Sequence, residues 1–330
     1  NPERYMHLLE IIPGEATLPE VLDFMAEFGE KRLGKGIVWA KDTPNFIGNR
    51  IGVQGIIKAM QLMLEMGLTI PEADALFGPV MGRPKTAMFK TTDLVGLDTM
   101  SHVAKNTYDL VKDDEARGDF AAPDFVAGMI EKKLLGNKTR AGFYKTDKSP
   151  DGKKIRQVIN PATLEYEAYG DVEFPCMAEA KTKKTLADKM KAVVFGKDKG
   201  AEYAWKVVAS GLIYAANRVP EISDTIVEID NAMKWGYNFE MGPFETWDAI
   251  GLKKSVDRMI KEKMKVPAKI KKMVDAGNKT FYKTEKGVVK YYDFSSKSYK
   301  PVAVSPDAVS LTVLKNTKME VKACPSASLV

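Results

Sequence analysis

A single carboxylate stands out in an apolar stretch near the start of the chain. Glu10 lies within residues 8–12, and its leucine and isoleucine neighbours predict burial. Because an unpaired buried carboxylate is costly, we expect Glu10 to have a partner. The alternative is an edge strand on which Glu10 points to water. The first interpretation makes Glu10 a candidate functional residue.

Asn49 is the second candidate. If a helix follows Pro44, Asn49 shares a face with Val53, Ile56 and Met60, which places a carboxamide on an apolar stripe. The alternative is an asparagine in the first helical turn that satisfies free backbone donors. We expect the neighbouring arginine at position 50 to be structural, through a pair with a carboxylate.

The periodicity of the sequence indicates the elements that hold these residues. Residues 6–12, 18–33 and 36–40 are typical of strand, helix and strand, the pattern of a βαβ element from a nucleotide-binding domain. A long amphipathic helix is expected after Phe46, ending near Gly67. The segment 69–72 (Thr-Ile-Pro-Glu) then predicts a capping box at the start of another helix.

Two motifs occur twice, in the same order. Residues 81–97 contain Met-Gly and Asp-Leu-Val-Gly-Leu, and residues 241–252 contain Met-Gly and Asp-Ala-Ile-Gly-Leu. Gly-Asn-Lys-Thr followed by Phe-Tyr-Lys-Thr occurs within 136–146 and again in 277–284. The glycines of both Met-Gly pairs are expected in turns, and a hairpin is expected at the end of each copy.

The expected fold is therefore mainly α, with two tandem copies of one helical domain after a remnant of a Rossmann-type α/β domain. The second copy carries Trp205, Trp235 and Trp247 but no equivalent of Glu10, so we expect it to be non-catalytic and to pack against the first. The expected divisions are 1–40 for the remnant, 41–166 for the first copy, 167–199 for a basic linker, 200–304 for the second copy, and 305–330 for a linker to a downstream region.

Composition restricts the class of protein. A chain of 330 residues that is 45% hydrophobic can form two ordinary domains. Its two cysteines, Cys176 and Cys324, lie far apart without metal-ligand spacing, which favours a reduced, cytoplasmic protein with no metal site. No apolar run approaches the length of about 20 residues that a membrane-spanning helix needs. No Gly-x-Gly-x-x-Gly follows a strand-like run, so we expect no NAD bound by these residues alone.

The net charge of +6 comes partly from a group of lysines between positions 181 and 199. Phe195 is the only aromatic residue near them, whereas nucleic-acid sites combine basic charge with several aromatic residues. We therefore expect a solvated helix or linker and no nucleic-acid partner. The alternative is that these lysines attract an anionic ligand.

Residues 42–50 read Asp-Thr-Pro-Asn-Phe-Ile-Gly-Asn-Arg, about thirty residues after the strand that holds Glu10. The N-terminal segment 1–12 and the segment 42–50, together with the two Met-Gly turns and the Gly-Phe-Tyr at 142–144, resemble the 3-hydroxyacyl-CoA dehydrogenase family. In that family a catalytic histidine lies in a His-Phe-Phe-Asn-Pro turn before the strand. Aligned on that turn, Asn1 and Pro2 are its last two residues, so the resemblance implies a fragment whose catalytic histidine lies upstream of residue 1.

The resemblance implies NAD-dependent oxidation of L-3-hydroxyacyl-CoA to 3-ketoacyl-CoA in fatty-acid β-oxidation. Glu10 would orient the catalytic histidine, and Asn49 would line the site near the substrate carbonyl. Neither His7 nor His102 occupies the position of the base. The family usually has glycine where this chain has Asn45, and asparagine tolerates positive φ.

The resemblance also suggests partners. Acyl-CoA is the implied substrate, the two helical copies would form an intramolecular pseudo-dimer, and a crotonase-type domain would lie downstream. The methionines between positions 51 and 100 are expected in the core, with a pliable wall for an acyl chain as the alternative. The competing hypothesis for the whole chain is a helical module that binds acyl-CoA or assembles subunits without catalysis.

Overall fold

The N-terminal segment forms a parallel β–α–β unit, as the sequence predicts. β1 (Leu8–Ile11) pairs with β2 (Gly36–Trp39), and Glu10 lies opposite Val38 in the register. Between them, α1 (Pro19–Glu27) continues into a π-helical turn (Phe28–Arg32). This parallel β–α–β unit makes the N-terminal region Rossmann-like.

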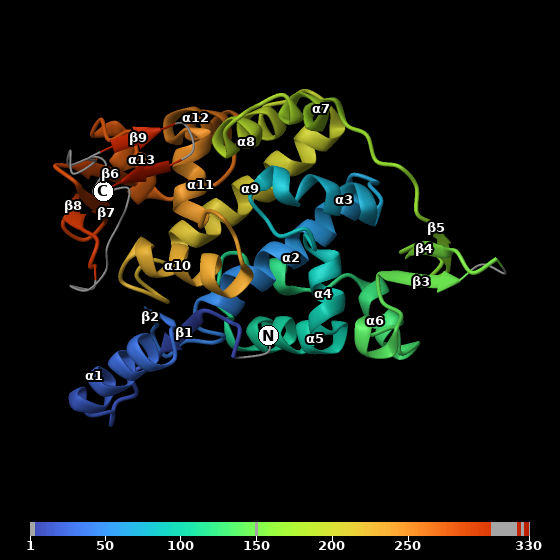
Figure 1. Cartoon of the computed structure of the whole chain (residues 1–330), viewed down its shortest axis with the longest axis horizontal. Coiled ribbons are helices and arrows are strands. Elements are labelled where there is room, and N and C mark those ends of the chain that lie inside the picture. Colours follow the sequence, from blue (N-terminus) through green and yellow to red (C-terminus); the bar gives the residue numbers. More distant parts are fainter. Residues whose placement is uncertain (1–3, 149–150, 305–321, 325–326, 330) are drawn as a thin grey trace.

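The computed structural model describes residues 4–148, 151–304, 322–324 and 327–329 (Figure 1).

Helix α1 projects from the rest of the molecule (Figure 1) and buries none of its residues. Phe24 is 63% exposed, and its ring stacks on the ring of Phe28 with 6.0 Å between the centroids. Other large apolar side chains around this helix are also exposed, namely Leu18, Val21, Met25 and Leu33. The helix therefore presents an open apolar face.

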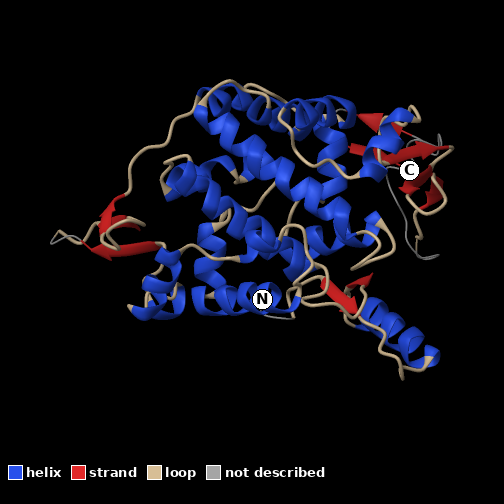
Figure 2. Cartoon of the chain, turned by 180° about the vertical axis from the view of Figure 1, so that it is seen from behind, coloured by secondary structure: helices blue, strands red, loops and turns tan. Residues whose placement is uncertain are grey.

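Helices make up most of the remaining chain, and Figure 2 shows them between two small sheets at opposite ends of the molecule. The first half contains α2 (Gly48–Glu65), α3 (Ile70–Leu76), the 3-10 turn η2 (Pro79–Met81), α4 (Phe89–Val95), α5 (Leu97–Leu110), η3 (Arg117–Phe120), α6 (Asp124–Glu131) and η4 (Asn137–Thr139). The second contains α7 (Pro175–Lys181), α8 (Leu186–Val194), α9 (Lys199–Arg218), α10 (Ile226–Tyr237), α11 (Pro243–Ile250), α12 (Leu252–Lys261) and α13 (Ala268–Asp275).

Both predicted hairpins are present, and each gains a third strand. One antiparallel sheet has the order β3 (Tyr144–Lys148), β4 (Lys154–Ile159), β5 (Tyr166–Ala168). The other has the order β6 (Tyr282–Glu285), β7 (Val288–Asp293), β8 (Ser298–Pro301).

Local sequence signals place several helix ends correctly. Helix α2 ends just before Gly67, whose φ is +61°. The capping box at the start of α3 is formed, because Thr69 and Glu72 each bond to the backbone N–H of the other. Asn45 has a φ of +61°, which confirms that it takes over the conformation expected of glycine.

The repeated motifs make matching contacts with buried aspartates. Asp74 accepts hydrogen bonds from the Phe89 N–H and the Tyr144 hydroxyl. Asp230 in the same way accepts from the Phe244 N–H and the Tyr282 hydroxyl, and burial raises the pKa of both aspartates. The two Met-Gly glycines differ, since Gly82 has a φ of +63° whereas Gly242 is extended with a φ of −73°. A Cβ on Gly242 would lie 2.3 Å from the Cα of Asp230, so close packing explains that glycine.

These repeats do not divide the structure into two tandem helical copies, and that part of the expected fold is wrong. One hydrophobic core runs through both halves, with α2 packed against α9. The buried Tyr203 hydroxyl of α9 donates to the Ala59 carbonyl of α2. The β–α–β unit packs against α10, and the Trp39 N–H bonds to Glu228. Apolar faces on both halves are buried against each other, so the halves form one helical body.

The segment 167–199 is not the linker that its lysines suggest. It contains α7 and α8, and Met190, Val193 and Val194 on α8 are buried against neighbouring helices. Most of its lysines lie on the outer surface, where Lys183 pairs with Glu179 and Lys191 with Asp188. The charge pattern therefore marks the solvated side of two packed helices.

The expected linker at 305–330 falls largely outside the described residues. Only the antiparallel pair β9 (Lys322–Cys324) and β10 (Ala327–Leu329) is described there. Among the helices that the structure describes, none is both long enough and apolar enough to cross a membrane.

Candidate active site

Glu10 is a partly buried side chain that binds the N-terminus of α2. Its Oε1 accepts hydrogen bonds from the N–H groups of Ile47 at 2.8 Å and Gly48 at 3.1 Å. A carboxylate in this position is stabilised by the free donors and the dipole of the helix. Burial nevertheless raises the pKa of Glu10, and the two backbone hydrogen bonds only partly oppose that rise. The interpretation as an edge residue pointing to water is therefore wrong.

The second oxygen of Glu10 remains available. Within the described part of the chain, Oε2 accepts no hydrogen bond. It lies close to the backbone at Gly48, where an added Cβ would be 3.6 Å from it. A carboxylate with one oxygen fixed by backbone donors and the other free can hold one more N–H donor in a set direction.

Asn49 is the next residue of α2 after the two donors to Glu10, so it lies at the same end of the helix. Its side chain is exposed and makes no hydrogen bond to any described residue. Asn49 does not cap the helix, because Glu10 has taken that role. The structure thus brings Glu10 and Asn49 to one helix end and leaves the carboxamide free to bind another group.

Tyr237, which the sequence did not single out, packs beside this helix end. A Cβ on Gly52 would lie 2.0 Å from the ring of Tyr237, so the ring rests directly on the backbone of α2. Burial and the charge of Glu10 both raise the pKa of the Tyr237 hydroxyl. The sequence feature that could have predicted this contact is the presence of Gly52 and Gly55 inside a helix, because helical glycines often allow close packing.

Arg50 has the structural role that the sequence predicts. It is fully buried, and its Nη2 lies 2.6 Å from Asp114 and 3.0 Å from Glu221. Its Nε donates to the Tyr214 hydroxyl at 2.5 Å, and Arg218 also pairs with Asp114 at 2.9 Å. This network ties α2 to α9 and to the loop after α5.

Neither histidine lies where a base beside Glu10 would be. His7 precedes β1, its Nδ1 lies 3.0 Å from the Gly34 carbonyl, and its ring meets Trp235 edge-on. His102 is exposed on α5. Among the described residues, no group of His, Cys, Asp or Glu could hold a metal ion.

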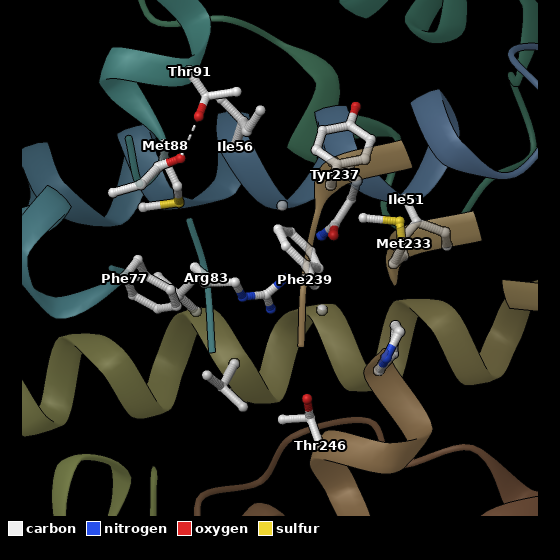
Figure 3. Close-up of a pocket in the computed structure, with 18 of the residues that line it drawn as sticks. Ile51, Ile56, Phe77, Arg83, Met88, Thr91, Met233, Tyr237, Phe239 and Thr246 are labelled. Atoms are coloured by element: carbon white, nitrogen blue, oxygen red, sulfur yellow. Dashed lines mark hydrogen bonds between the residues drawn. The ribbon is translucent and has the colours of Figure 1, made fainter. Parts of the chain in front are cut away.

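A cavity of about 100 Å³ begins one turn further along α2 and lies between α2, α9 and α10 (Figure 3). Ile51 and Gly52 line its near end, while Glu10 and Asn49 do not line it. Its wall is mainly apolar and includes Met88 and Met233. The cavity also contains Arg83, which the sequence did not single out.

Comparisons with known proteins identify the class to which this fold and site belong. The model of the 3-hydroxyacyl-CoA dehydrogenase C-terminal domain matches residues 46–146 and 206–291, more than half of the chain. The chain therefore belongs to the 3-hydroxyacyl-CoA dehydrogenase family, which confirms the resemblance seen in the sequence.

Particular relatives carry related names. A "Probable 3-hydroxyacyl-CoA dehydrogenase" of Bacillus subtilis (strain 168) is 44% identical over 330 residues, which cover all of this chain and 41% of that protein. A "Fatty acid oxidation complex subunit alpha" of Acinetobacter baylyi is 33% identical over 49% of this chain and 22% of its own length. The chain thus spans less than half the length of each of these relatives.

A solved structure corrects the expected fold class. The crystal structure of 3-hydroxybutyryl-CoA dehydrogenase from Escherichia coli K12 matches 84% of this chain and 70% of its own, with a TM-score of 0.59 and 19% identity. That likeness concerns the fold alone. Because one superposition covers most of the chain, the architecture is a Rossmann-like N-terminal region followed by a helical domain, to which both stretches of the family model contribute.

Proposed function

We propose that these residues form the substrate side of an NAD-dependent 3-hydroxyacyl-CoA dehydrogenase that acts in fatty-acid β-oxidation. The observation that carries the proposal is Glu10, held by the first backbone donors of α2 with Oε2 free, beside an unbonded Asn49. The names of the relatives support the substrate class.

In this proposal Glu10 positions a catalytic histidine that lies outside residues 1–330. Oε2 would accept the N–H of the imidazole, which fixes the ring and favours its charged form after it takes the hydroxyl proton. Asn49 would donate its amide N–H to the substrate oxygen on which charge develops. Both groups come from rigid elements that the same two backbone bonds hold together.

The residues described here do not fit NAD. The sequence has no glycine-rich loop after a strand, and β1 and β2 are the only strands of their sheet within the described part of the chain. A pyrophosphate needs such a loop at a helix N-terminus. The open apolar face of α1 supports the view that the rest of an NAD-binding domain packs there.

The test compares two polypeptides with 3-hydroxybutyryl-CoA and NAD. The polypeptide of residues 1–330 should neither bind NAD nor form NADH, whereas the polypeptide extended by its NAD-binding region should do both. In the extended enzyme, Glu10→Gln should lower kcat about 10²- to 10⁴-fold with little change in KM, because the histidine loses its orienting charge. Asn49→Ala should also lower kcat.

His102→Gln is the matched control, and it should keep wild-type turnover because His102 is exposed and has no described hydrogen bond or ion pair to Glu10 or Asn49. Equal kcat for the Glu10→Gln variant and the wild type would reject the assigned role. Tight acyl-CoA binding without any turnover by the extended enzyme would favour the non-catalytic module.

A further inference from the structure

Arg83 is a positive charge without a counter-ion in the cavity between the two halves of the chain (Figure 3). Within the described residues, its guanidinium has neither an ion pair nor a hydrogen-bond acceptor. Its Cζ lies 3.4 Å from the centroid of the Phe239 ring. Burial lowers the pKa of Arg83 to about 9, so the group still carries its charge at neutral pH. An arginine that is only partly exposed and has no acidic partner among the described residues favours an anionic ligand.

The position of Arg83 is fixed by the loops on either side of it. Gly82 turns the chain with a φ of +63°, and its carbonyl accepts a hydrogen bond from the Glu240 N–H at 2.8 Å. Asn238, with a φ of +55°, ends α10 and turns the chain before Phe239. These contacts hold the arginine and the aromatic ring together in a defined place instead of leaving a freely moving surface arginine.

The other residues that line the cavity are uncharged. Apolar side chains dominate its wall, with Ile51, Ile56, Val208, Leu212 and Met233 from α2, α9 and α10 and Met88 from the start of α4. Such a wall suits an alkyl chain, and methionine adapts to irregular apolar shapes. A guanidinium pairs well with a carboxylate, because its planar fork can donate two parallel hydrogen bonds.

We propose that this cavity of about 100 Å³ binds the carboxylate end of an alkyl chain, with the carboxylate at Arg83 and the first few carbons running along α2 toward Tyr237 and Ile51. Two sources share this chemistry. One is a free fatty acid. The other is an acyl thioester with a second carboxylate at its far end, whose thioester lies near Asn49, one turn of α2 from Gly52. The second source rests on the proposed function, whereas the first does not.

Calorimetric titration of the 330-residue chain with decanoate and with 1-decanol tests the site. Decanoate should bind more tightly than 1-decanol, and Arg83→Gln should weaken decanoate about 10- to 100-fold, the range expected for hydrogen bonds to a charged group. The same change should leave 1-decanol unaffected. Arg83→Lys keeps the charge and should retain part of the preference, and the exposed Arg156→Gln is the matched control that should retain all of it.

Failure of decanoate to bind, or an equal loss for decanoate and 1-decanol in the Arg83→Gln chain, would overturn the proposal. The CoA thioesters of dodecanoic acid and of dodecanedioic acid (one end esterified) then separate the sources. Tighter binding of the dicarboxylic thioester to wild type, abolished by Arg83→Gln, identifies the acyl thioester, and equal binding identifies the free fatty acid. A negative dehydrogenase assay leaves the decanoate result standing, so the two proposals fail separately.

Discussion

At the scale of single residues, the structure separates two kinds of charged side chain. Glu10 and Arg83 are partly buried, and each retains bonding capacity that no described residue uses. Arg50 differs, because carboxylates, a phenol hydroxyl and a backbone carbonyl surround its guanidinium. It is therefore a structural residue, although it stands next to Asn49 in the sequence.

Replacing Arg50 by alanine should destabilise the chain by about 3–5 kcal/mol, since it removes one partner from a buried ion network. The free energy of unfolding in urea, followed by circular dichroism, measures the loss. Lys105→Ala is the control, because Lys105 and its partner Asp109 are exposed and such pairs contribute about 0.5 kcal/mol or less. A loss below about 1 kcal/mol for Arg50→Ala would contradict the role assigned to the network.

At the scale of elements, α2 is the helix on which the site, the ion network and the cavity all depend. Gly52 allows the ring of Tyr237 to rest on its backbone, whereas a Cβ on Gly55 would meet nothing within 4 Å. The two glycines lie on the same helix one turn apart, so they form a matched pair.

Gly52→Ala should destabilise the chain by about 1–3 kcal/mol, because the added methyl group overlaps the Tyr237 ring and α10 must shift. Gly55→Ala should stabilise it by about 0.5–1 kcal/mol, because alanine favours the helix and meets no obstacle. Thermal unfolding of both variants gives the comparison. Destabilisation by both changes to the same extent would show that the close approach of Tyr237 is unimportant.

Buried aspartates join helices to the small sheets and should make stability depend on pH. Asp248 of α11 accepts hydrogen bonds from the Phe281 and Tyr282 N–H groups at the start of β6. Burial raises its pKa from 3.8 to about 7, and burial raises that of Asp93 to about 6. Between pH 3.8 and these raised pKa values, the folded chain therefore binds more protons than the unfolded chain. The contribution of the two protonated aspartates to the free energy of unfolding is complete below about pH 4 and is lost as the pH rises through 6 to 7.

The free energy of unfolding should consequently be larger at pH 5 than at pH 8. Asp248→Asn should remove on the order of 2 kcal/mol of that difference, because asparagine does not titrate. It should also lower stability overall, since an amide cannot accept both backbone hydrogen bonds. The exposed Asp257→Asn should leave the pH dependence as it is. The same slope in the Asp248→Asn chain would contradict the assignment.

At the scale of the whole molecule, the continuous core determines how the chain should unfold. Helices α2 and α9 belong to different halves of the sequence and pack against each other, and the β–α–β unit rests on α10. Each half therefore completes the apolar surface of the other.

We expect one cooperative transition for the helical body, because neither half has a separate core. Near-ultraviolet circular dichroism, to which the buried Trp205 and Trp247 contribute along with the other aromatic residues, should coincide with calorimetry across the transition. Gly52→Ala changes a residue of the first half. It should lower the unfolding midpoint seen in the aromatic signal by the same amount as the midpoint seen by calorimetry. Two separate transitions would instead favour two independent copies.

The sequence by itself determined the features that depend on near neighbours. The capping box at Thr69, the end of α2 at Gly67 and the positive φ of Asn45 depend on the identity of residues within a turn or two. The strand–helix–strand order follows from the local periodicity of the sequence. The partial burial of Glu10 was also predictable, because four apolar residues flank it within residues 8–12.

Only the tertiary structure decided which distant segments meet. The partner of Glu10 is a helix end 37 residues away, and Arg83 lies over an aromatic ring of the other half of the chain. The two repeated motifs gave a wrong expectation of two tandem copies, because repeated local contacts do not reveal whether their apolar faces are buried within each repeat or between them. The burial of one face of α8, whose other face carries lysines, could not be predicted from the sequence for the same reason. Periodicity shows that a face is apolar, but the element that covers it is set by packing between residues far apart in the sequence.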